Sequence, residues 1–239
     1  SPISSNQHSN RPRLLRALFT CGLFAKHFEF LEEKSQLYKL FVTFVNQNKP
    51  SEDNGYKIGD LAILLKALSG LGFMFERNPS FILNYETQSI YKTILGAALD
   101  VSSNKELEDY QEQTMIHVLK NLTNYLSGDL NQEISSTFDW SKENLKTMSS
   151  DETEEVDSNS IQSSIVQTYL SDIVKCTLCP LVTVRRASVN LIHIIHQGGI
   201  VHPLQLVPYL IAMSSDDDIN IRSRADHVLH EIERKYHGF

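Results

Sequence analysis

Residues 201–226 read VHPLQLVPYLIAMSSDDDINIRSRAD, and their pattern indicates the fold class. An apolar run with an internal proline leads into three aspartates, and the step Ile-Arg-x-Arg-Ala then opens a second apolar run. A similar step, VTVRRAS, occupies residues 182–188, so that Arg185 and Arg222 are equivalent and lie 37 residues apart. A two-helix unit of about this length is typical of HEAT or armadillo repeats.

The repeated step predicts an all-α protein, an α-solenoid of HEAT-type helix pairs that share one long core. Pro208 agrees with this fold, because the first helix of such a unit often contains a proline kink. The chain has 10 glycines and 7 prolines in 239 residues, fewer than a β-sandwich or an α/β enzyme of this length usually needs for its turns.

Apolar residues at helical spacing recur along most of the chain. They predict helices over residues 12–28, 36–46, 58–77, 85–99, 105–126, 161–178, 184–197, 203–213 and 221–236. The resulting division is a disordered segment (1–10), HEAT-like helical repeats (11–127), an acidic insertion (128–160) and two C-terminal HEAT repeats (161–239).

The insertion accounts for the net negative charge of the chain. Nine acids and two bases lie between residues 129 and 160, which accounts for the whole net charge of −7. Its few apolar residues cannot offset the entropy lost on ordering, so we predict one disordered acidic loop. Ser149 and Ser150 precede acids, as the substrates of an acid-directed kinase do, and a solvated spacer is the alternative.

Composition also bears on the compartment. Cys21, Cys176 and Cys179 lie in apolar surroundings and form no disulfide framework, which favours a reducing compartment. No apolar run reaches the length of a membrane span, and the N-terminal residues lack the core of a signal peptide. Because the chain begins at Ser1 without a methionine, we expect a segment excised from a longer protein.

The sequence offers one candidate metal site. Cys176-x-x-Cys179 precedes His193-x-x-His196 at a distance that resembles a zinc finger. Both pairs lie on predicted apolar helices and no β-hairpin is indicated, so packed cysteines and ordinary helix-face histidines are the preferred interpretation. We predict no metal, no cofactor and no enzymatic activity, since no nucleophile, phosphate loop or paired carboxylates can be argued.

The strongest candidate for partner binding is a set of arginines at the start of two second helices: Arg185, Arg186, Arg222 and Arg224. They could contact acidic protein or phosphate. Alternatively, they pair internally with the aspartates at 216–218. We favour internal pairing for Arg185 and Arg222 and outward contacts for Arg186 and Arg224.

A second basic cluster lies near the N-terminus. Lys26 and His27, together with Arg11, Arg13 and Arg16, could bind nucleic acid. Solvated helix residues are the alternative, and no aromatic residues alternate with the bases as in single-strand binders.

The C-terminal motifs resemble the Nipped-B family, the cohesin-loading factors also called sister chromatid cohesion protein 2 or adherin. The matching residues are Gln197, Gly198, His202, Pro203, 207–213, Ala225, Asp226, Glu231, Ile232, Lys235, Tyr236, Gly238 and Phe239. The structural motif residues in this resemblance are His202, Pro203, Pro208, Tyr209, Asp226 and Tyr236.

The resemblance extends over residues 14–239 and is strongest over 161–239. LFTCGLFAKHFEF, KALSGLGFMFERNPSFIL and SSIVQTYL are each similar to family segments. The turn Gly198-Gly199-Ile200-Val201 is one residue longer than usual, and residues 47–58 and the acidic insertion diverge.

The resemblance implies a non-catalytic HEAT scaffold in the nucleus, on chromatin. It implies contacts with the kleisin and SMC subunits of cohesin and with DNA, which promote cohesin loading and sister chromatid cohesion. The family's smaller TPR-type partner would bind outside this chain, and no membrane association is implied. The rival interpretation is a generic HEAT scaffold, such as a transport receptor or a phosphatase regulatory subunit.

Overall fold

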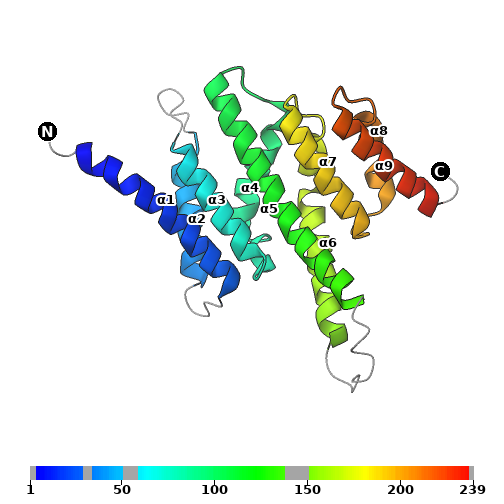
Figure 1. Ribbon diagram of the computed structural model, residues 1–239, viewed down its shortest axis with the longest axis horizontal. Helices are drawn as coiled ribbons and strands as arrows, with labels where there is room; N and C mark the ends of the chain where they lie inside the picture. Colours follow the sequence, from blue (N-terminus) through cyan, green and yellow to red (C-terminus); the bar gives the residue numbers. More distant parts are fainter. Residues whose placement is uncertain (1–3, 29–33, 51–58, 138–150, 237–239) are drawn as a thin grey trace. The chain divides into compact units, whose positions relative to one another are not determined.

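The structure, a computed structural model, describes residues 4–28, 34–50, 59–137 and 151–236. These residues form helices joined by turns, and none of them lies in a strand. Consecutive helices run back and forth in pairs (Figure 1). The all-α solenoid predicted from the repeated step is confirmed.

The chain forms two compact units. The first consists of Ser1–Ile94 with Ser102–Asn121, and the second consists of Leu95–Val101 with Leu122–Phe239. The long helix α5 (Lys105–Thr137) therefore contributes its first half to one unit and its second half to the other.

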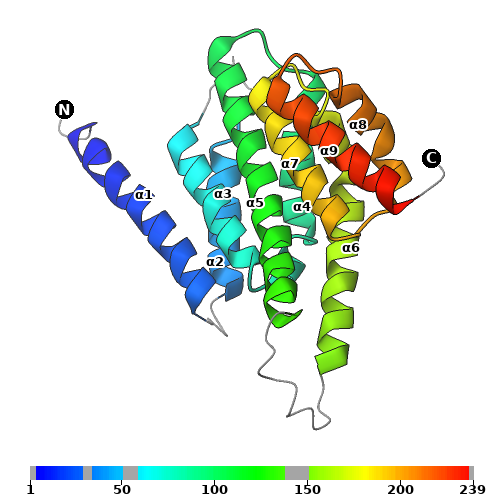
Figure 2. The same ribbon diagram turned by 45° about the vertical axis from the view of Figure 1, so that its right-hand side comes forward.

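In the first unit, three helices form a layer. Helices α1 (Ser4–His27) and α2 (Lys34–Gln47) both pack against α3 (Leu61–Phe75). Figures 1 and 2 show α1 alongside α3. The short helix η1 (Pro79–Phe81) then leads into α4 (Tyr85–Gly96).

Glycines allow these helices to approach closely. A Cβ on Gly22 of α1 would lie 2.8 Å from the Cα of Gly70 in α3. The ring of Phe41 from α2 covers Gly70 on another side, and Phe41 is fully buried. The apolar segment LSGLGFMF therefore forms the centre of this unit because its small residues admit neighbours from two helices.

The second unit contains the repeated helix pairs. Helix η2 (Ala97–Leu99) contacts α6 (Asp151–Cys176), which packs against α7 (Val182–Gln197). Helix α8 (Val207–Met213) pairs with α9 (Ile219–Lys235), and α9 also packs against α7 (Figure 2). The core of the second unit includes Ile165, Tyr169, Val184, Leu191, Ile195, Leu210, Ile221, Val228 and Ile232.

Three helices extend beyond their predicted ends. Helix α1 begins at Ser4 rather than Pro12, so helix replaces the disorder expected from residue 4 to residue 10. Helix α5 continues to Thr137 and α6 begins at Asp151, within the predicted insertion. A helix already nucleated by its apolar part gains one hydrogen bond for each residue added, even where the sequence is polar. Residues 138–150 lie outside the described residues.

The predicted proline kink is wrong. The segment 203–213 divides into η3 (Pro203–Gln205) and the short α8, and Pro208 is the second residue of α8. At the start of a helix a proline costs no hydrogen bond, because the first amides have no partner inside the helix.

The longer turn after α7 depends on a glycine. Gly199 has φ of +61°, a left-handed conformation that glycine adopts without steric cost. The amide of Gly199 donates to the carbonyl of His196 at 3.0 Å, and the amide of Ile200 donates to the carbonyl of Ile195 at 3.3 Å. These bonds satisfy the carbonyls at the end of α7.

Candidate functional site

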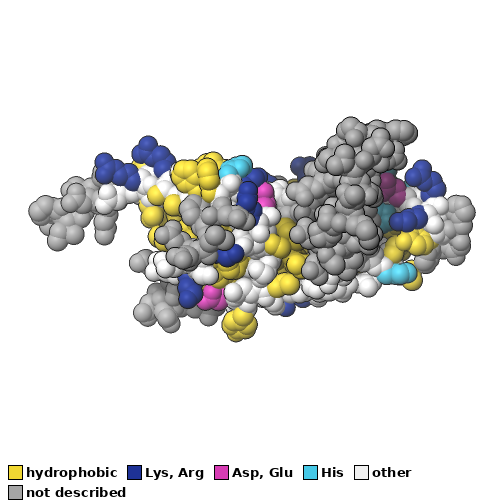
Figure 3. All heavy atoms as spheres, turned by 90° about the horizontal axis from the view of Figure 1, so that it is seen from below, with side chains coloured by type: hydrophobic (Ala, Val, Ile, Leu, Met, Phe, Trp, Pro, Cys, Tyr) yellow, Lys and Arg dark blue, Asp and Glu magenta, His cyan; other side chains and the backbone are white. Residues whose placement is uncertain are grey.

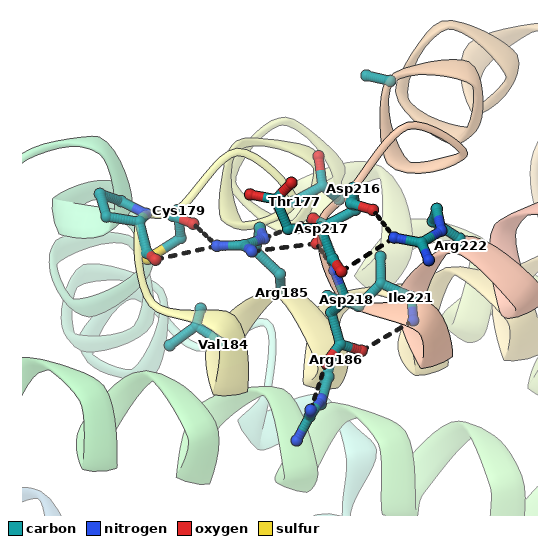
Figure 4. A network of polar contacts seen from close by, with 12 residues as sticks. Thr177, Cys179, Val184, Arg185, Arg186, Asp216, Asp217, Asp218, Ile221 and Arg222 are labelled. Atoms are coloured by element: carbon teal, nitrogen blue, oxygen red, sulfur yellow. Dashed lines mark hydrogen bonds and ion pairs between the residues drawn. The ribbon is translucent and has the colours of Figure 1, made fainter.

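Arg185 ties together two turns of the second unit (Figure 4). Its Nε and Nη2 donate to the two carboxylate oxygens of Asp216, at 2.7 and 3.1 Å. Its Nη1 donates to the carbonyls of Cys179 and Pro180, both at 2.9 Å. The guanidinium therefore links the turn after α6 to the turn after α8.

Arg222, the equivalent residue of the next step, makes the corresponding contacts with its own turn. Its Nη1 donates to the carbonyls of Asp216 and Asp217, at 2.5 and 2.9 Å. Arg185 therefore pairs with an aspartate of the neighbouring turn, whereas Arg222 is engaged through the backbone carbonyls of Asp216 and Asp217. The repeated Arg step fixes the turns between helices and holds successive second helices in register.

Arg186 and Arg224 lie differently. Arg186 is exposed but pairs with Asp218, so the internal pairing favoured only for Arg185 and Arg222 extends to Arg186. The Asp218 carboxylate also caps α9 by accepting hydrogen bonds from the amides of Asn220 and Ile221. The Arg186 guanidinium lowers the pKa of Asp218 from 3.8 to about 2. Arg224 is exposed and forms no ion pair or side-chain hydrogen bond with any residue that the structure describes.

Both of these arginines line one hollow. It lies between α7 and α9, has a volume of about 460 Å³ and is bordered by Arg186, Val189, Asn190, Asn220, Ser223, Arg224 and His227. Among the described residues, no acid lines it. We call this hollow the α7–α9 groove.

A histidine cluster beside the groove brings His193 and His196, considered above as metal ligands, to His227 and Glu231, which the sequence did not single out. His196 Nε2 lies 3.8 Å from one Glu231 oxygen, and His227 Nε2 lies 3.4 Å from the other. The His193 and His227 rings lie 5.8 Å apart between centroids, and Nδ1 of His193 has no hydrogen-bond partner in the described structure. Burial lowers the pKa of His193 and His196, which keeps both imidazoles neutral at neutral pH. The spacing of His227 and Glu231 at i and i+4 was the available signal.

The candidate zinc ligands are placed as packed side chains. Cys176 and Cys179 are buried, and burial raises the pKa of Cys176 to about 12. A thiol with so high a pKa stays protonated, which disfavours metal binding. Among the residues that the structure covers, no group of three or more metal-binding side chains could hold an ion.

The basic cluster of α1 is largely engaged within the first unit. Lys26 lies 3.0 Å from a carboxylate oxygen of Glu76, and the Arg77 guanidinium donates to the carbonyls of Lys26 and His27. Arg11 forms an ion pair with Asp60, the residue that caps α3. These bonds place Lys26 and Arg11 in contacts between helices.

Exposed aromatic side chains lie on α1 and directly after its end. Phe19, Phe24 and Phe28 are 40%, 49% and 58% exposed. Figure 3 shows hydrophobic and basic side chains next to each other at the end that contains α1. The ammonium of Lys66 lies 4.6 Å from the centroid of the Phe19 ring, a cation–π distance.

The predicted structural motif residues all belong to the last helix pair and the segments directly before and after it. His202 caps η3 by accepting a hydrogen bond from the amide of Leu204, and Pro203 is buried. The ring of Tyr236, at the end of α9, lies 6.4 Å from the His202 ring. Tyr209 is half-buried in α8, and the carbonyl of Asp226 lies 2.7 Å from Nδ1 of His230.

Two further expectations have different outcomes. Ser149 and Ser150, the candidate phosphorylation sites, lie outside the described residues. In the part of the chain that the structure covers, no helix has the length and apolar character needed to cross a membrane.

The chain is similar in sequence to one family of known proteins. The family model described as sister chromatid cohesion C-terminus matches residues 162–239. The chain is 33% identical to the Nipped-B-like protein of Mus musculus and 34% identical to Nipped-B-like protein B of Danio rerio, in each case over 100% of this chain and 8% of the relative. It is 27% identical to the Nipped-B protein of Drosophila melanogaster, over 95% of this chain and 10% of that protein.

Proposed function

This chain belongs to the Nipped-B family of sister chromatid cohesion proteins, and on that premise we propose that it is a non-catalytic HEAT scaffold segment of a cohesin loader. In this role it contacts the kleisin and SMC subunits of cohesin and DNA, and so promotes loading on chromatin in the nucleus. The observation that carries the proposal is similarity to Nipped-B-like proteins along the whole chain.

The chain spans about 8% of the length of the vertebrate relatives that it matches. We propose that the complete activity of a loader also requires regions outside the part of these relatives that the chain matches. We propose that the TPR-type partner of the family binds such a region, as the resemblance implies.

The internal arginine bonds support a scaffold role. Arg185 and Arg222 hold the turns of successive helix pairs, Arg185 through Nε, Nη1 and Nη2 and Arg222 through Nη1. We therefore assign to these two residues an indirect part in binding, through the shape of the surface. We propose that Arg186 and Arg224, which are exposed, contact the partner directly.

Lys26 and His27 belong to a second surface. Lys26 pairs with Glu76, while the His27 side chain is exposed beside the aromatic residues of α1. We propose that this end of α1 binds another protein surface rather than DNA, because exposed aromatic area stabilises protein association more than it stabilises phosphate binding.

A generic HEAT scaffold, such as a transport receptor or a phosphatase regulatory subunit, is the weaker alternative. This alternative was considered because HEAT pairs alone do not specify a function. The family match is specific to sister chromatid cohesion and leaves this alternative without an observation in its favour.

A pull-down with purified cohesin subcomplexes tests the proposal. The chain is immobilised and offered kleisin segments, SMC heads or duplex DNA over a range of salt concentrations. Saturable retention of kleisin or SMC heads is expected, and the double variant Arg186→Glu/Arg224→Glu should weaken it about tenfold or more. Arg234→Glu on α9 is the matched control. Absence of any retention by a chain with helical circular dichroism and cooperative melting would overturn the proposal.

A further inference from the structure

The border of the α7–α9 groove is basic and polar apart from Val189. Its volume of about 460 Å³ falls in the range of sites that hold small ligands or a few residues of a peptide. Arg186 and Arg224 supply its charge, and among the described residues no aspartate or glutamate borders it. A negatively charged occupant therefore meets two guanidinium groups and no carboxylate on the border.

The amide and hydroxyl groups of the groove are not used by the fold. Asn190, Asn220 and Ser223 are exposed, and no side-chain hydrogen bond of theirs occurs within the described structure. Each asparagine side chain presents two donors and an acceptor, the set needed to bind both the N–H and the C=O of a peptide backbone. Val189 is buried beneath them and provides an apolar floor.

The two arginines differ in how they are held. Arg186 is anchored by Asp218 through one terminal nitrogen, so its other donors still face the groove. Arg224 has no ion pair among the described residues and is free to form a bidentate contact with a carboxylate. One anchored and one unpaired guanidinium on facing helices can bind two carboxylates along an extended chain.

We propose that the α7–α9 groove binds an extended acidic peptide segment of a protein partner. Carboxylates of the segment pair with Arg224 and Arg186, while Asn190 and Asn220 bind its backbone. The inference rests on the proposed function and deepens it, because it gives the chemistry by which a cohesin subunit or another partner is recognised at this face.

Duplex DNA fits the groove less well. Binding to a phosphate backbone gains strength from many basic contacts, commonly six or more. The groove offers two arginines, one already paired, among neutral amides and a hydroxyl. That mixture matches a peptide with both side-chain carboxylates and backbone amides.

Fluorescence anisotropy with a labelled ten-residue peptide of alternating Glu and Gly tests the inference on the whole chain. A peptide with Gln at every Glu position controls for charge, and a 20-base-pair duplex is the competing ligand. We expect the Glu peptide to bind at 0.15 M salt at least tenfold more tightly than the Gln peptide. Arg224→Glu should abolish this difference, Asn190→Ala should weaken binding by about fivefold, and Arg234→Glu should leave it unchanged.

Three results would overturn the inference. These are equal binding of the Glu and Gln peptides, full binding by the Arg224→Glu variant, or tighter and steeply salt-dependent binding of the duplex that the peptide cannot displace. The proposed function fails separately. If cohesin subcomplexes are retained but the Glu peptide does not bind, the scaffold role stands and the groove is not its contact.

Discussion

At the scale of single residues, Asp216 is the acid that joins the two helix pairs of the second unit. Its carboxylate accepts both hydrogen bonds from Arg185, and it also accepts one from the amide of Asp218 at 2.8 Å. The side chains of Arg185 and Asp216 are only 17% and 9% exposed, so solvent screens this pair weakly.

We therefore expect Asp216→Ala to lower the free energy of unfolding by about 2 kcal/mol, the usual cost of losing hydrogen bonds to a charged group. The neighbouring Asp217 is the matched control. It is exposed and uses only its backbone carbonyl, so Asp217→Ala should change stability by less than about 0.5 kcal/mol. Urea denaturation measures both variants, and equal losses would contradict the role given to Asp216.

The Arg186–Asp218 ion pair should make the stability of the chain depend on pH. Ion pairing lowers the pKa of Asp218 from 3.8 to about 2, so its carboxylate contributes stability that is complete above about pH 4. This contribution is lost as the pH falls through about 2. Asp218→Asn removes the charge but retains an oxygen that can cap α9.

The variant should lose stability less steeply than the wild type between pH 4 and pH 2. Urea denaturation at several pH values in this range measures the two slopes. Parallel curves would show that the Arg186–Asp218 pair contributes nothing to folding.

At the scale of elements, the fit between α3 and α5 depends on Gly72. The Asn121 side chain occupies the space where a Cβ on Gly72 would lie. Its Nδ2 donates to the carbonyl of Leu68 and to the hydroxyl of Tyr91, both at 2.8 Å, and this network is buried. A methyl group at position 72 must displace the amide from both bonds.

Gly72→Ala should therefore lower the free energy of unfolding by about 1–3 kcal/mol, the usual cost of overpacking a core. Gly96 in α4 has no neighbouring atom within 4 Å of the position of its Cβ. Gly96→Ala should accordingly be neutral or stabilising by up to about 1 kcal/mol. Thermal unfolding followed by circular dichroism separates these outcomes, and a stable Gly72→Ala variant would contradict the packing described.

The helices themselves could be predicted from apolar periodicity, but their polar ends could not. The first turns of α1 and the last turns of α5 have no apolar stripe, and only continuity with the rest of the helix makes them helical. Pro208 was assigned to a kink because sequence spacing did not show that η3 and α8 are separate.

At the scale of the whole molecule, the pairing of Arg185 with Asp216 followed from the repeat, because equivalent positions in stacked pairs face the same turn. The α7–α9 groove could not be predicted from the repeat, because residues 186–190 and 220–227 come together only when α7 packs against α9. His193 and His196 were noted only as candidate metal ligands, because their approach to His227 and Glu231 also depends on the packing of α7 against α9. The net charge of −7 comes from residues 129–160 and gave no information about the groove.

The most direct test of the central claim, that this chain is a cohesin-binding scaffold, is hydrogen–deuterium exchange with and without a saturating complex of kleisin and SMC heads. We expect slower exchange in the chain when cohesin is present, concentrated in peptides that cover residues 186–190 and 220–227. Unchanged exchange in every peptide, from a chain that retains helical circular dichroism, would contradict it.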